Sequence, residues 1–234
     1  MSKIQMIRAV IFDIDNTLID FLEMKKKSLG PAVDAMIAKG LKMRKEDALA
    51  KIYELYKRYG MEYKLIFQEF LKSVGQSDYK ILAAGIIGYR SRREVKPYPG
   101  MVKVLHELKK RCLKLAIVSD APNLKAWMRL TYMEIDDMFD VVVAFDDTNV
   151  AKPAKLPFEK AVAELGVKRQ EVLMIGDMPE KDVVGAKAMG FISCFAKYGN
   201  KEVKTGKSGA DYEAERPEDI LVIIDKINHG KLSD

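Results

Sequence analysis

Cysteine and histidine are scarce in this sequence of 234 residues, which contains two of each. Cys112 and Cys194 lack metal-ligand spacing, so we expect reduced structural thiols, one at a helix end and one in a buried strand. His106 and His229 lie too far apart to predict a zinc site or a Ser/His relay. Any chemistry must therefore come from carboxylates, hydroxyls and lysines.

Long apolar runs are also missing, because no stretch approaches the roughly 20 residues that a membrane helix needs. Arg8 and Asp13 interrupt the first apolar stretch, which argues against a secretory signal. These absences predict an intracellular, cytoplasmic protein that does not bind membranes. Hydrophobic residues at 48% and charged residues at 32% are typical of a globular chain rather than a disordered one.

Neither sign of charge is scarce, and the formal net charge is +6. Basic residues are spread among acidic ones, which favours a solvated mixed surface over a nucleic-acid interface. Asparagine and glutamine are sparse while lysine and glutamate are abundant, a composition typical of proteins from thermophiles.

Five apolar stretches predict buried parallel strands, at residues 7–14, 113–119, 140–145, 171–176 and 191–197. Amphipathic helical patterns separate most of them, and Gly166 is placed to end one of these helices. The alternation predicts an α/β fold, with a Rossmann-like parallel sheet covered by helices on both faces.

Residues 19–95 interrupt this alternation, because they contain helical patterns and no convincing strand. Two prolines, at positions 97 and 99, then mark the return to the alternating pattern. We therefore expect a catalytic core formed by residues 1–18 and 96–234, with an all-helical cap subdomain inserted at 19–95.

Other prominent side chains have plain structural interpretations. Lys25, Lys26 and Lys27 are expected on a solvated helix face, the alternative being a basic rim that steers anionic substrates. Trp127 is expected in the core. A group of tyrosines at near-helical spacing favours packing between cap helices over a substrate pocket; it comprises Tyr53, Tyr56, Tyr59 and Tyr63.

Polar side chains gather where the predicted strands end. They comprise Asp13, Asp15 and Thr17 after the first strand, Ser119 and Asp120 after the second, Lys152 after the third, and Asp177 and Asp182 after the fourth. In open parallel sheets, ligands bind beyond the carboxyl ends of the strands. Four loops should therefore aim acids, a hydroxyl and an ammonium at one region.

These acids would repel one another unless a cation lay among them, and oxygen ligands without histidine or cysteine indicate Mg²⁺. Beside that ion Asp13 can act as a nucleophile on phosphorus, and Asp15 can serve as general acid and then as general base. Ser119 and Lys152 would bind the phosphoryl oxygens.

The order Asp13-x-Asp15-x-Thr17, Ser119, Lys152-Pro153 and Gly176-Asp177-x-x-x-x-Asp182 resembles the four motifs of the haloacid dehalogenase superfamily. The resemblance covers the whole chain, including a helical cap between the first and second motifs. It implies a phosphatase-type hydrolase in which Asp13 is the nucleophile and a Mg²⁺ ligand. It further implies that Asp15 supplies acid–base catalysis and a metal-binding backbone carbonyl.

The same resemblance implies roles for the other motif residues. Thr17 would help to hold the loop that opens and closes the cap, and it is grouped with the phosphate-binding residues Ser119 and Lys152. Asp177 would be a direct or water-linked Mg²⁺ ligand, and Asp182 would orient the metal shell.

Two positions depart from the family pattern. Asp120 stands where many relatives have asparagine; it is placed in the phosphate-binding set, although an extra carboxylate there needs a partner or must point away. The second proline after Lys152 comes later than usual, at Pro157, while Phe158 keeps its offset, which predicts an altered turn.

The predicted function is a Mg²⁺-dependent phosphatase for a small phosphorylated metabolite, because a cap excludes bulky substrates. Sugar or triose phosphates, phosphoglycolate-like acids and nucleotides all stay open. The alternatives are a 2-haloacid dehalogenase, a phosphomutase and a non-catalytic basic binding module. Asp15 argues against the first, since a halide leaves without a proton, and the complete site argues against the last. No nucleic-acid or membrane partner is expected, and a homodimer stays open.

Overall fold

The computed structural model describes residues 6–61, 63–91 and 95–230, and the chain forms two compact units. The larger unit comprises Met1–Asp20 with Val95–Asp234, and the smaller one comprises Phe21–Glu94. Within the described residues, no helix combines the length and apolar character needed to cross a membrane.

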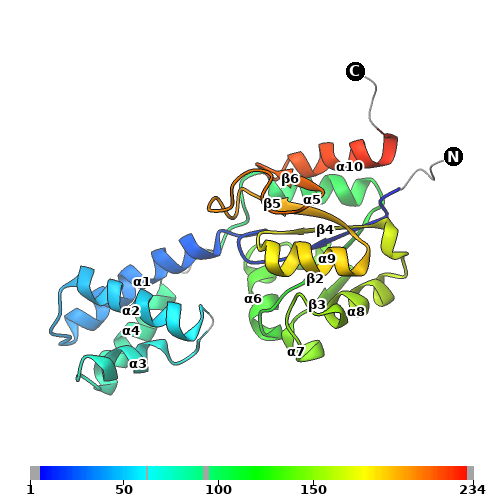
Figure 1. Ribbon diagram of the computed structural model, residues 1–234. Helices are drawn as coiled ribbons and strands as arrows, with labels where there is room; N and C mark the ends of the chain where they lie inside the picture. The colour runs from blue at the N-terminus through cyan, green and yellow to red at the C-terminus, as the bar shows by residue number, and fades with distance from the viewer. Residues whose placement is uncertain (1–5, 62, 92–94, 231–234) are drawn as a thin grey trace. The chain divides into compact units, whose positions relative to one another are not determined.

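The larger unit is built on a six-stranded sheet with the order β3-β2-β1-β4-β5-β6 (Figure 1), and all of its strand pairs are parallel. The strands are β1 (Ala9–Phe12), β2 (Lys114–Val118), β3 (Val141–Val143), β4 (Val172–Gly176), β5 (Ile192–Ala196) and β6 (Tyr212–Ala214). The first five lie within the predicted stretches. Sequence reasoning missed β6 because it spans three residues with Glu213 at its centre.

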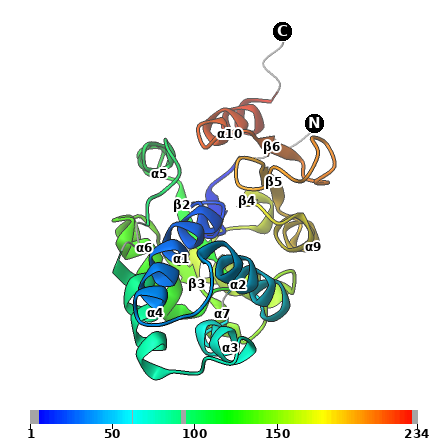
Figure 2. The same cartoon turned by 90° about the vertical axis from the view of Figure 1, so that its left-hand side faces the viewer.

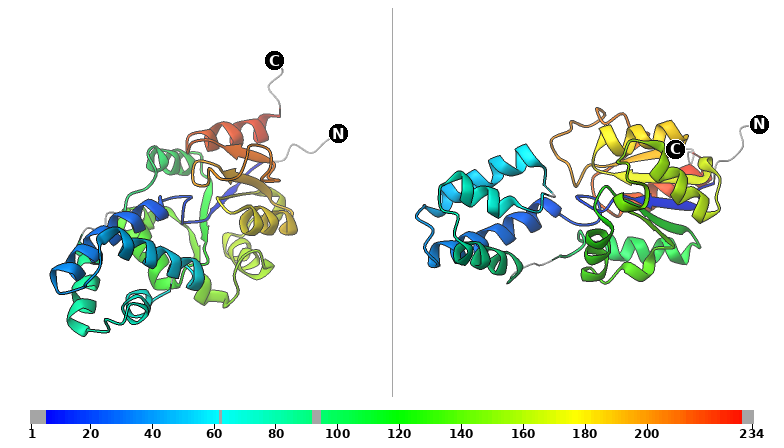
Figure 3. Two further views of the ribbon diagram at one scale, coloured as in Figure 1. Left: turned by 60° about the vertical axis from the view of Figure 1, so that its left-hand side comes forward. Right: turned by 90° about the horizontal axis from the view of Figure 1, so that it is seen from below.

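Helices cover both faces of the sheet, as predicted. On one face lie α5 (Met101–Lys110) and α10 (Asp219–His229), and on the other lie α8 (Lys155–Leu165) and α9 (Val184–Met189) (Figures 1 and 3). The remaining elements are α6 (Asn123–Tyr132), α7 (Phe145–Thr148), 3₁₀ turns at Asp136–Met138 and Arg169–Glu171, and a π-helical turn at Pro179–Val183.

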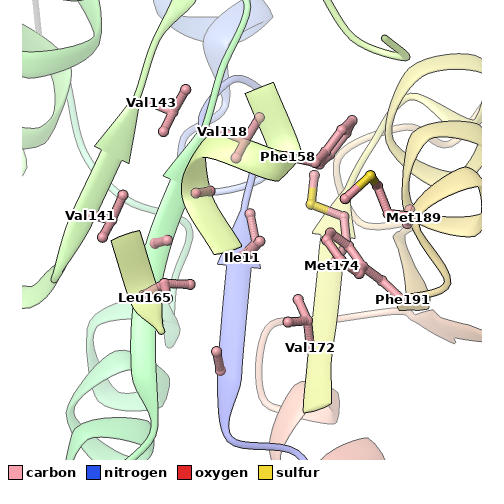
Figure 4. Packing of buried hydrophobic residues seen from close by; sticks show 14 residues of the cluster. Ile11, Val118, Val141, Val143, Phe158, Leu165, Val172, Met174, Met189 and Phe191 are labelled. Atoms are coloured by element: carbon pink, nitrogen blue, oxygen red, sulfur yellow. The ribbon is translucent and has the colours of Figure 1, made fainter. Parts of the chain in front are cut away.

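The core between the sheet and helices α8 and α9 is apolar (Figure 4). Ile11, Val118 and Met174 point from neighbouring strands toward Phe158 and Leu165 of α8. Phe158, six residues after Lys152, is fully buried in this core. Gly166 ends α8 with φ 64°, as predicted, because glycine adopts this left-handed conformation without a steric penalty.

The smaller unit is entirely helical where it is described, with α1 (Phe21–Ala38), α2 (Lys45–Tyr59), α3 (Ile66–Ser73) and α4 (Tyr79–Ser91) (Figure 2). Helices α1 and α4 lie side by side and approach closely. A Cβ atom at Gly88 would come within 2.5 Å of the Pro31 carbonyl oxygen, so glycine permits this packing.

The lysine run of α1 differs from its predicted solvated face. Lys26 and Lys27 are exposed, but Lys25 is buried, because the helical period turns its side chain inward. Its ammonium lies 2.5 Å from the Met61 carbonyl oxygen and 4.5 Å from the centre of the Tyr56 ring. Lys25 therefore cannot contribute to the alternative, a basic rim that steers anionic substrates.

The four tyrosines singled out in the sequence, at positions 53, 56, 59 and 63, differ in their burial. Tyr56 is buried, Tyr53 packs against the same apolar cluster, and the Tyr59 and Tyr63 rings stack with their centres 4.8 Å apart. Packing is therefore confirmed for Tyr53, Tyr56 and Tyr63, which join the apolar cluster of this unit, whereas Tyr59 is 38% exposed.

The prediction for Trp127 is wrong: its residue is 43% exposed, because α6 turns Ala126, Arg129 and Leu130 inward instead. Both cysteines are free thiols; Cys194 is buried in β5 and Cys112 is exposed.

Candidate active site

The predicted acids lie together at the carboxyl ends of the central strands. Asp13 follows β1, and its N–H donates to the Ile175 carbonyl of β4 across 2.9 Å. The register pairs Phe12 with Ile175, so Asp13 and Asp177 leave neighbouring strands within one residue of each other. The parallel pairing of β1 and β4 thus brings two motifs that are far apart in the sequence to the same edge of the sheet.

Lys152 links two of these acids from the loop after β3. Its ammonium lies 2.6 Å from Asp13 Oδ1 and 2.7 Å from Asp182 Oδ1. Burial opposes the charge on this ammonium, but Asp13, Asp182 and Asp120 outweigh it and raise the pKa of Lys152. The charged form of Lys152 is therefore favoured within this cluster. The Lys152–Pro153 peptide bond is cis.

Asp182 reaches this site from the π-helical turn after β4. Its Oδ2 accepts a hydrogen bond from the Met178 N–H at 3.0 Å. The carboxylate also lies so close to Gly176 that a Cβ atom at that position would collide with it. The glycine that precedes Asp177 thereby makes room for the acid six residues after it.

Asp13, Asp177 and Asp182 form a buried cluster that could hold a metal ion, because one carboxylate oxygen of each lies within 4.8 Å of the others. Burial, followed by repulsion from Asp13 and Asp182, raises the pKa of Asp177. Burial also raises the pKa of Asp182, although Lys152 opposes the shift. The carboxylates thus repel one another, and an oxygen-only donor set of this kind fits a hard divalent cation.

The extra carboxylate, Asp120, has two partners within the protein. Its Oδ1 accepts a hydrogen bond from the Lys152 N–H at 2.8 Å, and its Oδ2 lies 2.9 Å from the Lys181 ammonium. Sequence reasoning missed Lys181, whose place directly before Asp182 was the available signal. Asp120 therefore fixes the Lys152 loop, and its charge is offset.

Asp15 is paired with an arginine that the sequence analysis did not single out. Its Oδ2 lies 2.7 Å from Nη1 of Arg129, which is buried on α6. Ser119 is also buried, and its hydroxyl accepts a hydrogen bond from the Ala121 N–H at 3.2 Å.

The segment after β5 supports the loop that carries the first motif. The Tyr198 hydroxyl donates to the Thr17 carbonyl at 2.9 Å, and the Asn200 amide donates to the Asp177 carbonyl at 3.0 Å. Between them, Gly199 lies against the Asn16 carbonyl, where a Cβ atom would collide. The Tyr-Gly-Asn sequence directly after a strand was the signal that could have drawn attention to these residues.

Thr17 lies inside this supported loop rather than on its surface. The residue is fully buried, and its Oγ1 atom has no hydrogen-bond partner among the described residues. Its N–H donates to the Ile14 carbonyl at 3.3 Å. These contacts make Thr17 part of the turn that presents Asp13 and Asp15.

Comparison with known proteins places this site in a family. Residues 10–196 match the model of the haloacid dehalogenase-like hydrolases. A glyceraldehyde 3-phosphate phosphatase of Pyrococcus abyssi is 34% identical over 228 residues, which cover 95% of this chain and 96% of that protein. The phosphatase of the same name from Methanocaldococcus jannaschii is 30% identical over 222 residues, covering 94% and 97% of the two chains.

A solved structure agrees with this assignment. The crystal structure of a HAD phosphatase from Thermococcus onnurineus superposes with a TM-score of 0.69 at 26% identity, covering 93% of this chain and 98% of that one. The chain therefore belongs to the haloacid dehalogenase-like hydrolase family.

Proposed function

We propose that this enzyme is a magnesium-dependent phosphatase that transfers a phosphoryl group from a small phosphate monoester to Asp13 and then hydrolyses the aspartyl-phosphate. The enzyme is a phosphoric monoester hydrolase, and the buried cluster at its strand ends carries the proposal. There Asp13 shares the Lys152 ammonium with Asp182 and lies beside Asp177. This arrangement supplies a nucleophile together with positive charge for phosphoryl oxygens.

Asp13, Asp177 and Asp182 would hold Mg²⁺, which binds a few carboxylate oxygens and keeps several waters. When bound, the ion supplies positive charge that offsets both the carboxylates and the phosphoryl oxygens. Asp182 is already engaged by Lys152 and Met178, so it would orient the other ligands.

In the first half of the reaction, an Asp13 oxygen forms a bond to phosphorus while the bond from phosphorus to the leaving oxygen breaks. The Asp15 carboxyl group gives its proton to that oxygen. The Lys152 ammonium and the Ser119 hydroxyl bind the phosphoryl oxygens.

In the second half, a water oxygen attacks phosphorus and the bond between phosphorus and Asp13 breaks. Asp15, now a carboxylate, takes a proton from the water. The nucleophile and the acid are then restored for the next turnover. Because a departing halide needs no proton, the Asp15 role favours this reaction over 2-haloacid dehalogenation.

Triose phosphates are the favoured substrate class, because the two matched relatives described above are named for glyceraldehyde 3-phosphate. Other small esters, including sugar phosphates, phosphoglycolate-like acids and nucleotides, belong in the same test. A phosphomutase would require a bisphosphate activator, which gives a direct way to recognise it.

The test is phosphate release from a panel of small phosphate esters, with Mg²⁺ or with EDTA. We expect release that needs Mg²⁺ and that falls by at least about 10³-fold in Asp13→Asn. The matched control is Asp34→Asn, which removes an exposed carboxylate paired with Lys45 and should leave the rate unchanged. Wild-type rates in Asp13→Asn, or metal-free halide release from a 2-haloacid, would contradict the proposal.

A further inference from the structure

Arg129 is the largest fully buried side chain among the described residues, with 1% of its surface exposed. It lies on the inward face of α6, beside Ala126 and Leu130. An apolar side chain would fill this position without the electrostatic cost of burying a guanidinium group. The reason for an arginine at this position should therefore lie in the polar group that it contacts.

That partner includes Asp15, whose Oδ2 lies 2.7 Å from Arg129 Nη1. The Asp15 side chain is 25% exposed, so part of it is accessible to solvent, whereas its contact with Arg129 is made on the buried side. The pair joins the turn after β1 to a helix more than a hundred residues further along the chain.

We propose that Arg129 is a positioning residue that holds the Asp15 carboxyl group where it exchanges protons with the leaving oxygen and with water. This inference rests on the proposed phosphatase function. A guanidinium group suits the task, because it is planar, presents its donors in a rigid fork and stays charged at all relevant pH values. Its fixed place on α6 thereby defines the orientation of Asp15.

Asp15 takes part in both halves of the reaction, first as an acid and then as a base, and Arg129 lies beside it in both. When the bond from phosphorus to the leaving oxygen breaks, the Asp15 proton moves to that oxygen and leaves a carboxylate beside Arg129. When water attacks the phosphoryl group, its proton moves to the same carboxylate while the Asp13–phosphorus bond breaks. Between these steps the charged pair keeps Asp15 in place.

The test compares kcat/KM for an alkyl ester, glycerol phosphate, with kcat/KM for p-nitrophenyl phosphate. This parameter covers the steps through release of the alcohol, and an alkoxide needs the Asp15 proton far more than nitrophenolate does. Arg129→Met should lower the alkyl value by about 10- to 100-fold and the aryl value by less than about threefold. Arg129→Lys keeps the positive charge but loses the forked arrangement of donors. Its ratio of alkyl to aryl kcat/KM should therefore lie between the wild-type ratio and that of Arg129→Met.

Three controls separate positioning from a general structural role. Unfolding midpoints and Mg²⁺ titration calorimetry on each variant show whether the fold and the carboxylate cluster persist. Arg111→Met removes another arginine, paired with Asp225 away from the site, and should leave the ester ratio unchanged. In an Asp15→Asn background, Arg129→Met should cause no further loss of alkyl-ester hydrolysis.

Equal losses for both esters, or additive losses in the double variant, would overturn the assignment of Arg129. If Arg129→Met does not fold, the ratio measured for Arg129→Lys decides, and an unchanged ratio rejects the proposal. Failure of the underlying function looks different, because wild-type protein would then release phosphate from neither ester.

Discussion

Each unit contains a buried lysine, and the described partners of the two lysines differ. Lys152 of the larger unit contacts the carboxylates of Asp13 and Asp182 at 2.6 and 2.7 Å. Lys25 of the smaller unit contacts the Met61 carbonyl oxygen and lies over the Tyr56 ring. A carbonyl oxygen and ring faces are thus among the partners of the buried cation in the helical unit, whereas carboxylates surround the buried cation at the strand ends.

The comparison teaches that burial alone does not identify a functional lysine. Lys152 lies in the loop after α7, and its ammonium meets acids that follow the central strands β1 and β4. Lys25 occupies an inward position on a helix, where the surrounding side chains come from packing. The first and last of the four predictions below test this distinction, and the other two test the loop and the acids around Lys152; they run from the largest expected effect to the smallest.

Replacing Lys152 should have the largest effect. In Lys152→Met, phosphate release should fall on the order of 10³-fold, because the phosphoryl oxygens lose a buried cation. Without Mg²⁺ the variant should also be less stable by about 3–5 kcal/mol, since buried carboxylates lose their partner. Steady-state rates and chemical unfolding with EDTA measure the two effects. A stable, active variant would remove Lys152 from the site.

Two glycine substitutions should differ in their effect on activity. Gly199→Ala should lower activity by about 10- to 100-fold, because its Cβ collides with the Asn16 carbonyl and displaces the loop that carries Asp13. Gly30→Ala, within α1, meets no atom within 4 Å apart from its chain neighbours and should leave the activity unchanged. Activity and unfolding midpoints of both variants provide the measurement. An active Gly199→Ala enzyme would show that this close approach is dispensable.

Removing one acid should expose the repulsion at the strand ends. Burial and the neighbouring Asp13 and Asp182 raise the pKa of Asp177 in the folded protein. A raised pKa contributes stability below the unfolded value of about 3.9, and that stability is lost as pH rises through the folded pKa. Metal-free Asp177→Asn should therefore exceed wild type in unfolding midpoint, by a margin that grows with pH.

The same variant should lose the stabilisation that Mg²⁺ gives to wild type. Thermal unfolding across pH, with Mg²⁺ or with EDTA, measures both effects. A lower midpoint for metal-free Asp177→Asn at high pH would show that the carboxylates do not repel one another in the folded state.

The smallest effect concerns Lys25. In Lys25→Met the Met61 carbonyl loses a donor, which should cost about 1–3 kcal/mol, whereas Lys26→Met changes an exposed residue and should lie within about 0.5 kcal/mol of wild type. Chemical unfolding of the two variants makes the comparison. Equal stabilities of the two variants would show that Lys25 contributes no more to stability than an exposed lysine does.

The sheet and the clustering of site acids could be predicted from the sequence because strand ends are locally recognisable. Asp13 and Asp177 follow continuous apolar runs, and parallel pairing brings such ends together. The contacts that hold the site residues in place could not be predicted from the sequence. Arg129 meets Asp15, and Tyr198 meets Thr17, across long sequence separations that only the tertiary structure closes.

Two other interpretations failed for a local reason. Lys25 and Trp127 both lie on helices, where the direction of a side chain depends on which face meets a neighbour. The three consecutive lysines suggest a solvated face by their type, although Lys25 shares the buried face of α1 with Phe21 and Leu29. A tryptophan likewise suggests burial by its type alone. Their exposure was therefore fixed by packing.

The most direct test of the central claim is to trap the phosphoryl group on the enzyme. Protein turning over a small ester with Mg²⁺ would be quenched in acid, digested and analysed by mass spectrometry, with Asp15→Asn used to slow hydrolysis of the intermediate. The mechanism predicts one phosphoryl group on Asp13, absent with EDTA and absent in Asp13→Asn. A phosphoryl group on another residue, or turnover with Asp13 unmodified throughout, would contradict it.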